Sequence, residues 1–286
     1  MTGRVDAHHH LWDLAVRHHA WIDPDRMSRI HRDFSTVDLA AAVAGTGVDR
    51  TVVVQSVAVA AETAELLAVA AADDLVAGVV GWVDLTDPAV ADRLAELVAG
   101  PGGDRLVGIR HLVQAEPDPR WLCRPDVRRG LAAVEAAGLA YDLLVFPHQL
   151  PAATEAARAL SDLRLVLDHL GKPPIAAGAL EPWAGLLRRL AAEPGVTVKL
   201  SGMVTEASSS GWTVEDLRPF ADSALNAFGP DRTMFGSDWP VCLLAADGYA
   251  DVLAAADALT AGLSAGERAA VFGGTADRVY GLDAGS

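Results

Sequence analysis

Short runs rich in β-branched residues alternate with Ala- and Leu-rich segments of helical spacing along this chain. The short runs are expected to be buried parallel strands, because a strand covered on both faces is apolar almost throughout. Eight strands are predicted, at Arg4–His8, Arg50–Ser56, Leu75–Val83, Leu106–His111, Ala140–Val145, Arg164–Asp168, Val196–Leu200 and Thr233–Ser237. Helices are predicted between them, for example at Val37–Ala44, Glu62–Ala72, Pro88–Ala99, Val127–Ala137 and Leu180–Ala192.

Eight strand–helix units favour an α/β fold with one closed (β/α)8 barrel of the TIM type. No change in composition divides the 286 residues, so a single domain over residues 1–286 is expected. Two helices, Tyr249–Thr260 and Ala265–Val271, are expected to close the ring after the eighth strand. The alternative is an open, doubly wound sheet with a cap, which the count of eight strands disfavours.

Two segments without periodicity interrupt this rhythm, Leu11–Ser35 after the first strand and Glu116–Pro125 after the fourth. In a barrel both would lie on the face where active sites are built, since loops that follow strands form that face. They carry Trp12, Trp21 and Trp121, and we interpret them as lids over a pocket. Ordinary surface loops with incidental aromatic residues are the alternative.

The composition excludes several classes of function. Acidic residues outnumber basic ones by 38 to 23, and the formal charge of −15 repels phosphate backbones and anionic lipid. Neither nucleic acid nor a membrane is therefore expected as a partner, and no uncharged stretch approaches the ~18 residues of a spanning helix. Asp6 and three histidines interrupt the N-terminal region where a signal peptide would be apolar, so a cytoplasmic protein is expected. A homo-oligomer is left open.

Histidines mark the predicted barrel mouth. All nine precede residue 170, and five lie at or just after predicted strands, at His8, His10, His111, His148 and His169. The period of two along a strand places Asp6, His8 and His10 on one side and His9 on the other. His8 and His10 could then reach one divalent ion or one carbonyl oxygen, although local hydrogen bonds would also account for the pair.

His169 ends the sixth predicted strand, and Asp238 follows the eighth. Because the carboxyl ends of barrel strands meet at one mouth, we expect both to join His8 and His10 there. Three imidazoles and a carboxylate suit one zinc-type ion with an open position for water. The Asp238 carboxylate could instead act without a metal as a general base, or merely cap a loop.

Basic and amide side chains at strand ends are candidates for substrate binding. The chain has 21 arginines but two lysines, Lys172 and Lys199, near the ends of predicted strands six and seven. A lysine is a compact charge that suits an oxyanion, a carboxylate or a sugar hydroxyl, and we expect Lys172 to take part in catalysis. Gln55, Arg110 and His111 end the second and fourth strands and are predicted to bind substrate, as is Trp12. Salt bridges and hydrogen bonds at the barrel mouth are the alternative role for these polar groups.

Several catalytic motifs are absent. No Gly-rich loop of the dinucleotide or Walker type follows a strand, which argues against a nucleotide cofactor. Ser201 and Ser237 lack the Gly-x-Ser-x-Gly elbow of serine hydrolases. Cys123 and Cys242 are too few for a disulfide framework.

Six blocks, taken together and in order, resemble the lactonase branch of the amidohydrolase superfamily. They are Val5–Asp13, Gly108–His111, Tyr141–Val145, Val166–Pro173, Lys199–Gly202 and Phe235–Val241, and the resemblance spans almost the whole chain. The segments around Trp121, Arg124–Val127 and Gln149–Pro151 are most similar to fuconolactonase-like sugar lactonases.

The resemblance implies a (β/α)8 barrel that hydrolyses a lactone ring. It assigns Asp238 to the activation of water and places His8, His10 and His169 around the scissile carbonyl or one metal ion, with His169 or Lys172 assisting the leaving ring oxygen. Members of the branch differ in whether they need a metal. Arg110 and Lys199 stand where a two-metal member would carry further ligands, so a binuclear centre is not expected.

A neutral sugar lactone such as L-fuconolactone is the expected substrate. The alternatives are a lactone of a di-acid, of the muconolactone or pyrone type, a metal-dependent decarboxylase of a cyclic acid, and a sugar-binding barrel without activity.

Overall fold

The computed structural model describes residues 3–207 and 211–282, so the outermost residues of the predicted 1–286 domain lie outside this description. Eight parallel strands form one sheet in the order of the sequence. Their bounds are β1 Arg4–His9, β2 Val48–Val54, β3 Val76–Gly81, β4 Leu106–His111, β5 Ala140–Leu143, β6 Leu165–Leu167, β7 Val196–Leu200 and β8 Thr233–Phe235. All eight predicted strands are confirmed. The barrel closes where His9 bridges Trp239 in parallel, which excludes the open doubly wound sheet.

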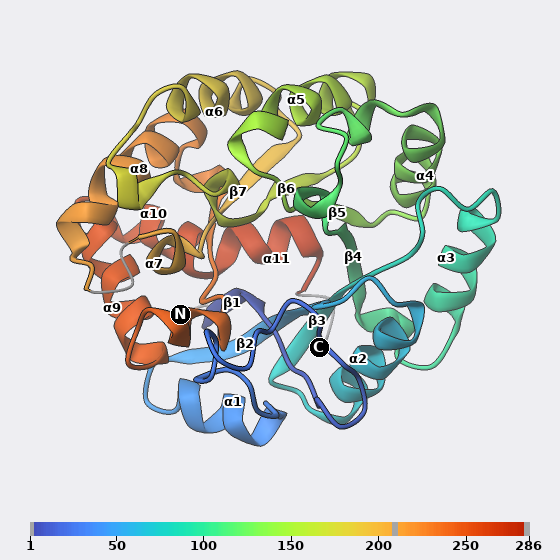
Figure 1. The fold of residues 1–286 in the computed structure, drawn as a ribbon, viewed down its shortest axis with the longest axis horizontal. Helices are drawn as coiled ribbons and strands as arrows, with labels where there is room; N and C mark the ends of the chain where they lie inside the picture. The colour runs from blue at the N-terminus through green and yellow to red at the C-terminus, as the bar shows by residue number, and fades with distance from the viewer. Residues whose placement is uncertain (1–2, 208–210, 283–286) are drawn as a thin grey trace.

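Helices surround this barrel as the alternating pattern predicts (Figure 1). Their bounds are α1 Thr36–Val43, α2 Ala60–Ala72, α3 Val90–Ala99, α4 Pro125–Ala136, α5 Leu150–Ala159, α6 Trp183–Ala191, α7 Met203–Glu206, α8 Val214–Phe228, α9 Tyr249–Leu259, α10 Ala265–Ala269 and α11 Thr275–Tyr280. Within the described ranges, no helix combines the length and the apolar character needed to cross a membrane.

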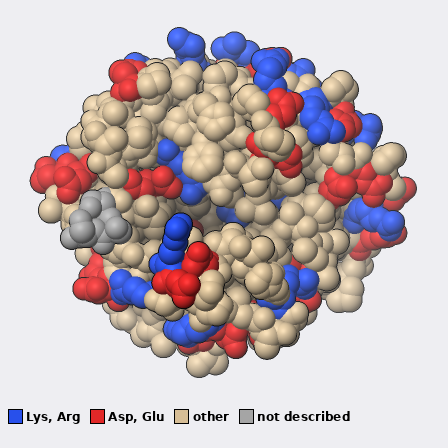
Figure 2. All heavy atoms as spheres, in the orientation of Figure 1, with Lys and Arg blue, Asp and Glu red and all other residues tan. Residues whose placement is uncertain are grey.

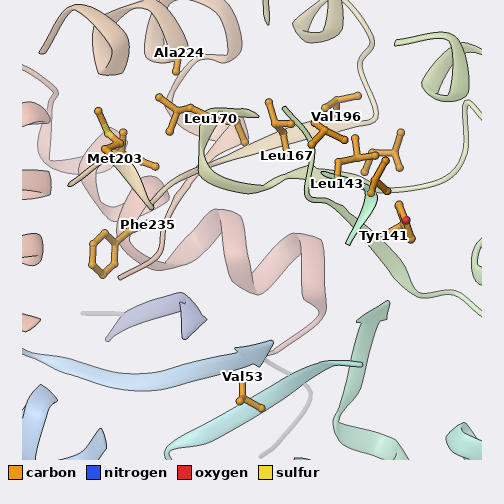
Figure 3. Close-up of a cluster of buried hydrophobic side chains, with 14 of the residues drawn as sticks. Val53, Tyr141, Leu143, Leu167, Leu170, Val196, Met203, Ala224 and Phe235 are labelled. Atoms are coloured by element: carbon orange, nitrogen blue, oxygen red, sulfur yellow. The ribbon is translucent and has the colours of Figure 1, made fainter. Parts of the chain in front are cut away.

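Apolar side chains on the outer faces of the strands pack against these helices. Leu143, Leu167 and Phe235 belong to this large cluster, part of which is drawn in Figure 3. A second, smaller cluster fills the inside of the barrel and includes Val80, Val166 and Met234. The alternation of strand side chains between the two clusters is the reason that both faces of each strand are apolar.

The end of the chain differs from the prediction. The second closing helix was expected at Ala265–Val271, but α10 ends at Ala269, a π-helical turn spans Ala270–Gly274, and α11 follows. Helix α11 crosses the middle of the ring in Figure 1, and Val279 and Tyr280 join the inner cluster. Asp277 pairs with Arg50 at the amino end of β2 at 2.7 Å. Helix α11 therefore closes the end of the barrel opposite to the strand ends that carry the histidines.

The predicted placement of Asp6 is wrong. The pairing of β1 with β2 shifts register between Asp6 and His9, so the period of two breaks there. Ala7 and His8 therefore both face the interior, while the Asp6 carboxylate accepts hydrogen bonds from Ser237 and from the Tyr249 hydroxyl at 3.0 Å. His9 faces outward as predicted and hydrogen-bonds Thr51.

Candidate active site

Four predicted side chains meet at the carboxyl end of the barrel. The Nε2 atoms of His8 and His10 lie 3.2 Å apart. Oδ1 of Asp238 lies 3.4 Å from His10 Nε2, 3.8 Å from His8 Nε2 and 3.9 Å from His169 Nε2. All four side chains are nearly buried. The structure therefore brings together the set that was expected from strands one, six and eight.

The backbone holds Asp238 against the end of β1. The Asp238 N–H donates to the carbonyl of His8 at 2.8 Å, and the His10 N–H donates to the carbonyl of Trp239 at 2.7 Å. Asp238 adopts a left-handed conformation with φ 56°, which non-glycine residues rarely adopt outside functional or tightly constrained sites. These contacts tie the last strand to the first and aim the carboxylate at the imidazoles.

Each site histidine is oriented through its other ring nitrogen. Nδ1 of His10 lies 2.7 Å from the carbonyl of Val54, and Nδ1 of His169 lies 2.9 Å from the Ser201 hydroxyl. Nδ1 of His8 lies 3.2 Å from Asp168 Oδ1. With Nδ1 engaged in all three rings, Nε2 is the nitrogen that faces the centre. This arrangement is typical of metal-binding or carbonyl-binding histidines.

Burial and neighbouring charges set the ionisation of the site. Burial lowers the pKa of His8 well below its ordinary value, and the Lys199 charge lowers it further. Burial lowers the pKa of His169 to about 4. Burial by itself would raise the pKa of Asp238, but its contacts with His169, His10 and His8 hold that pKa well below its usual range. At neutral pH the rings of His8 and His169 are thus neutral and lie beside an ionised carboxylate.

A layer of buried charges lies directly beneath the histidines. Arg110 Nη1 is 3.0 Å from Asp168 Oδ2 and 3.3 Å from His8 Nε2. Lys199 Nζ is 3.1 Å from Asp168 Oδ1 and 2.5 Å from Asp142 Oδ2. Burial raises the pKa of Asp142 and the nearby Lys199 lowers it, and together these effects leave the pKa at about 6. Arg110 therefore forms the salt bridge that the sequence offered as its alternative role, and it also contacts His8 of the site.

Gln55 and His111, which the sequence predicts to bind substrate, differ in how many of their polar atoms are free. Gln55 is buried beside Arg110, donates from Nε2 to the Arg110 carbonyl at 3.1 Å, and its Oε1 finds no hydrogen-bond partner within the described ranges. Both ring nitrogens of His111 are engaged, by Trp82 Nε1 at 3.0 Å and by Glu116 Oε1 at 2.8 Å. His111 also stacks on Trp121.

Lys172 and Trp12 belong to the walls of the mouth. Lys172 Nζ donates to Glu206 at 3.0 Å. Trp12 is buried, donates from its indole to the carbonyl of Arg32 at 2.7 Å, and its ring centroid lies 6.4 Å from that of His10. His148, which also follows a strand, is exposed.

The segment Leu11–Ser35, which the sequence predicts to be a lid, lies beside the site, because the Trp12 ring neighbours the His10 ring. Its two ends pair through Trp12 and Phe34, and His19 hydrogen-bonds Ser56 at 2.8 Å. A cavity of about 500 Å³ lies between this segment and α2, and its lining includes Trp12 but none of the four site residues. The face in Figure 2 is hollowed near its centre, with Lys or Arg atoms visible in the hollow.

The site residues fit one divalent ion. Two imidazole nitrogens bound to one zinc ion at about 2.0–2.1 Å and near the tetrahedral angle are roughly 3.3 Å apart, close to the 3.2 Å between His8 and His10. His8, His10 and Asp238 form a set whose ligand atoms all lie within 4.8 Å of one another. A second such set contains His8, Asp168 and His169, but there the Lys199 ammonium already contacts the carboxylate and the ring.

Some residues of the site were missed by sequence reasoning. Asp142 is a charged residue inside a buried strand, and this misplaced charge is the signal that could have revealed it. Ser201, which lacks the elbow motif of a nucleophilic serine, orients His169 through its hydroxyl. Gly202 follows it with φ 62° and packs against the His169 ring. Tyr280 carries no local signal, because its partner Asp142 lies 138 positions away.

The arrangement of these residues on a closed barrel agrees with comparisons to known proteins. The family model described as Amidohydrolase matches residues 5–282. Two curated relatives, both named L-fucono-1,5-lactonase, are 43% and 40% identical. The first, from Burkholderia multivorans, is matched over 98% of this chain and 96% of its own length. The second, from Burkholderia ambifaria, is matched over 99% and 97%.

A solved structure extends this similarity to three dimensions. The crystal structure of an amidohydrolase from Burkholderia multivorans with bound zinc is 41% identical and has a TM-score of 0.92. The match covers 98% of this chain and all of that one. The closed barrel, the converging histidines and the aspartate after the last strand agree with this full-length similarity. The chain belongs to the amidohydrolase family.

Proposed function

We propose that this chain is a lactonase that hydrolyses a sugar lactone, L-fucono-1,5-lactone or a close stereoisomer, to the aldonic acid. The observation that carries the proposal is the convergence of His8, His10 and Asp238 at the barrel mouth. Its support comes from the two L-fucono-1,5-lactonases that match over nearly the full chain.

Asp238 is the residue that activates water in this proposal. Its carboxylate is ionised at neutral pH and lies within 4 Å of three imidazoles, so a water held by Oδ1 faces the same centre. The water oxygen adds to the lactone carbonyl carbon while its proton passes to Asp238. The bond from that carbon to the ring oxygen then breaks, and the ring oxygen receives either the proton held by Asp238, passed on through Nε2 of His169, or a proton from the Lys172 ammonium.

The carbonyl oxygen gains negative charge in this step, and His8 and His10 lie where it would be held. The same two residues, with Asp238 and His169, would hold one divalent ion, and zinc fits the nitrogen-rich ligand set. Metal binding there would supply Lewis acidity toward the carbonyl and toward bound water. His169 Nε2 can serve as a ligand or as a proton relay, but only one at a time.

The surroundings favour a neutral, hydroxylated substrate. The net charge of −15 disfavours the approach of di-acids. Both buried cations of the inner layer, Arg110 and Lys199, are already paired with carboxylates, which leaves little free charge to clamp a second carboxylate. Gln55 Oε1 is an acceptor without a partner within the described ranges, which suits a sugar hydroxyl. These features argue against the decarboxylase and the di-acid lactonase.

The test is a comparison of substrates on one preparation of the enzyme. A pH-indicator assay measures acid release from L-fucono-1,5-lactone and other neutral aldonolactones, and from muconolactone and 2-pyrone-4,6-dicarboxylate. We expect kcat/KM for the best aldonolactone to exceed that for either of these acidic lactones by at least about tenfold, which corresponds to roughly 1.4 kcal/mol of transition-state binding. A preference for an acidic lactone would overturn the sugar assignment, and loss of CO2 without ring opening would overturn the lactonase.

A further inference from the structure

Lys199 is one of two lysines in the chain and is fully enclosed in the barrel. Its ammonium contacts three groups, Asp142 Oδ2 at 2.5 Å, Asp168 Oδ1 at 3.1 Å and His8 Nδ1 at 3.1 Å. The ammonium donates a hydrogen bond to Asp142, and it lies in ion-pair contact with Asp168 and directly against the His8 ring. No part of the hydrolysis described above uses Lys199.

Stability alone gives a poor account of this buried layer. Taking charges out of water is costly, and well-packed apolar residues commonly replace a buried ion pair without loss of stability. Apolar packing is available at this level of the barrel, because Val166 pairs in register with Asp142 and Met234 pairs in register with Lys199. The charged residues are therefore better explained by what they hold in place.

Their contacts lead to the two ring nitrogens of His8. Lys199 lies at Nδ1, while Arg110 Nη1 lies 3.3 Å from Nε2. Asp168 links the two cations, since Oδ1 contacts Lys199 and Oδ2 contacts Arg110. Asp168 also precedes His169, whose backbone has φ 53°. A displacement of Asp168 would therefore reach two of the site histidines.

The geometry points to Lys199 as a positioning residue. We propose that its buried ammonium holds Asp168 and the ring of His8 in place, so that Nε2 of His8 faces Asp238. The effect on turnover rests on the proposed function. The effect on the orientation of His8 does not, because the affinity of the site for zinc reports on it separately.

A double variant separates positioning from charge balance. Lys199→Met combined with Asp142→Asn removes one cation and one anion from the layer, so no new unpaired charge is buried. The matched control is Arg50→Met with Asp277→Asn, which removes an ion pair at the opposite end of the barrel. For each protein, kcat and KM with the best aldonolactone, zinc affinity by chelator competition, and the thermal midpoint are measured.

We expect the Lys199→Met/Asp142→Asn protein to stay folded while its kcat falls about 10–100-fold, the usual effect of removing a residue that orients a ligand. KM should change less than about threefold, and zinc affinity should fall by at least about tenfold. The control should keep both kcat and zinc affinity near the wild-type values. If wild type turns over no lactone, the proposed function fails, and the zinc affinities still decide the role of Lys199.

A folded double variant whose kcat and zinc affinity both lie within about threefold of wild type would overturn the proposal, because charge balance would then be the whole role of Lys199. Should that protein fold poorly, Lys199→Leu with Asp142→Asn, which likewise offers no donor toward Asp168, is measured in its place. A reduction of zinc affinity of at least about threefold in this variant supports positioning, and unchanged zinc affinity refutes it.

Discussion

A single methyl group at Gly202 should displace His169. Gly202 has φ 62°, and a Cβ built on it would lie 2.5 Å from Nδ1 and 2.6 Å from Cγ of the His169 ring. Ordinary contacts begin near 3.4 Å, so the ring must move by roughly 1 Å in a Gly202→Ala protein. The substitution also costs about 1–2 kcal/mol, because an L-residue is strained in the left-handed conformation.

Gly178→Ala is the control that isolates the backbone cost. Gly178 has nearly the same φ, 63°, but a Cβ there meets no atom within 4 Å. Both variants should lose the free energy of the strained backbone, about 2–4 °C in thermal midpoint for each kcal/mol in a domain of this size, and Gly202→Ala should lose more because a buried ring must move. Only Gly202→Ala should lose turnover, by about 10–100-fold, since a misplacement near 1 Å can cost up to about 10²-fold.

The assay is lactone hydrolysis with a pH indicator, alongside thermal unfolding of both variants. Gly202→Ala with kcat within about threefold of wild type, and a thermal midpoint lowered as in Gly178→Ala, would refute the placement of His169 in the reaction. Equal losses of kcat in the two variants would instead attribute the effect to the strained backbone.

Three further outcomes are expected. Asp238→Asn should lower kcat by roughly 10²-fold or more with little change in KM, and activity within a few-fold of wild type in the same indicator assay would rule out Asp238 as the base. Elemental analysis should find at most about one zinc per chain, because His8, His10, His169 and Asp238 hold one four-coordinate ion; two equivalents lost together on chelation would contradict this. Burial lowers the pKa of His169 to about 4, so its ring is neutral above that pH and gains a proton below it. The profile of kcat/KM, corrected for spontaneous hydrolysis, should therefore stay level down to about pH 5 and fall as the pH approaches 4, and an acidic limb near pH 6.5 would disagree.

Much of the fold and the centre of the site followed from the sequence. The apolar runs predicted all eight strands, because parallel strands covered on both faces need continuous apolar residues. The convergence of His8, His10, His169 and Asp238 could also be predicted from the sequence, because the carboxyl ends of all strands in a closed barrel lie at one face, independent of loop conformation.

Tertiary structure decided the rest, since the responsible contacts have no local signature. Asp6 faces outward because the register shifts within β1, which a strict period of two does not predict. Lys199 is paired with Asp142 and contacts His8, residues that are 57 and 191 positions away in the chain. The sequence predicts that His111 binds substrate, but Trp82 and Glu116 engage both of its ring nitrogens. The sequence by itself determined which side chains reach the mouth of the barrel, and packing among distant segments decided which of them keep free atoms there.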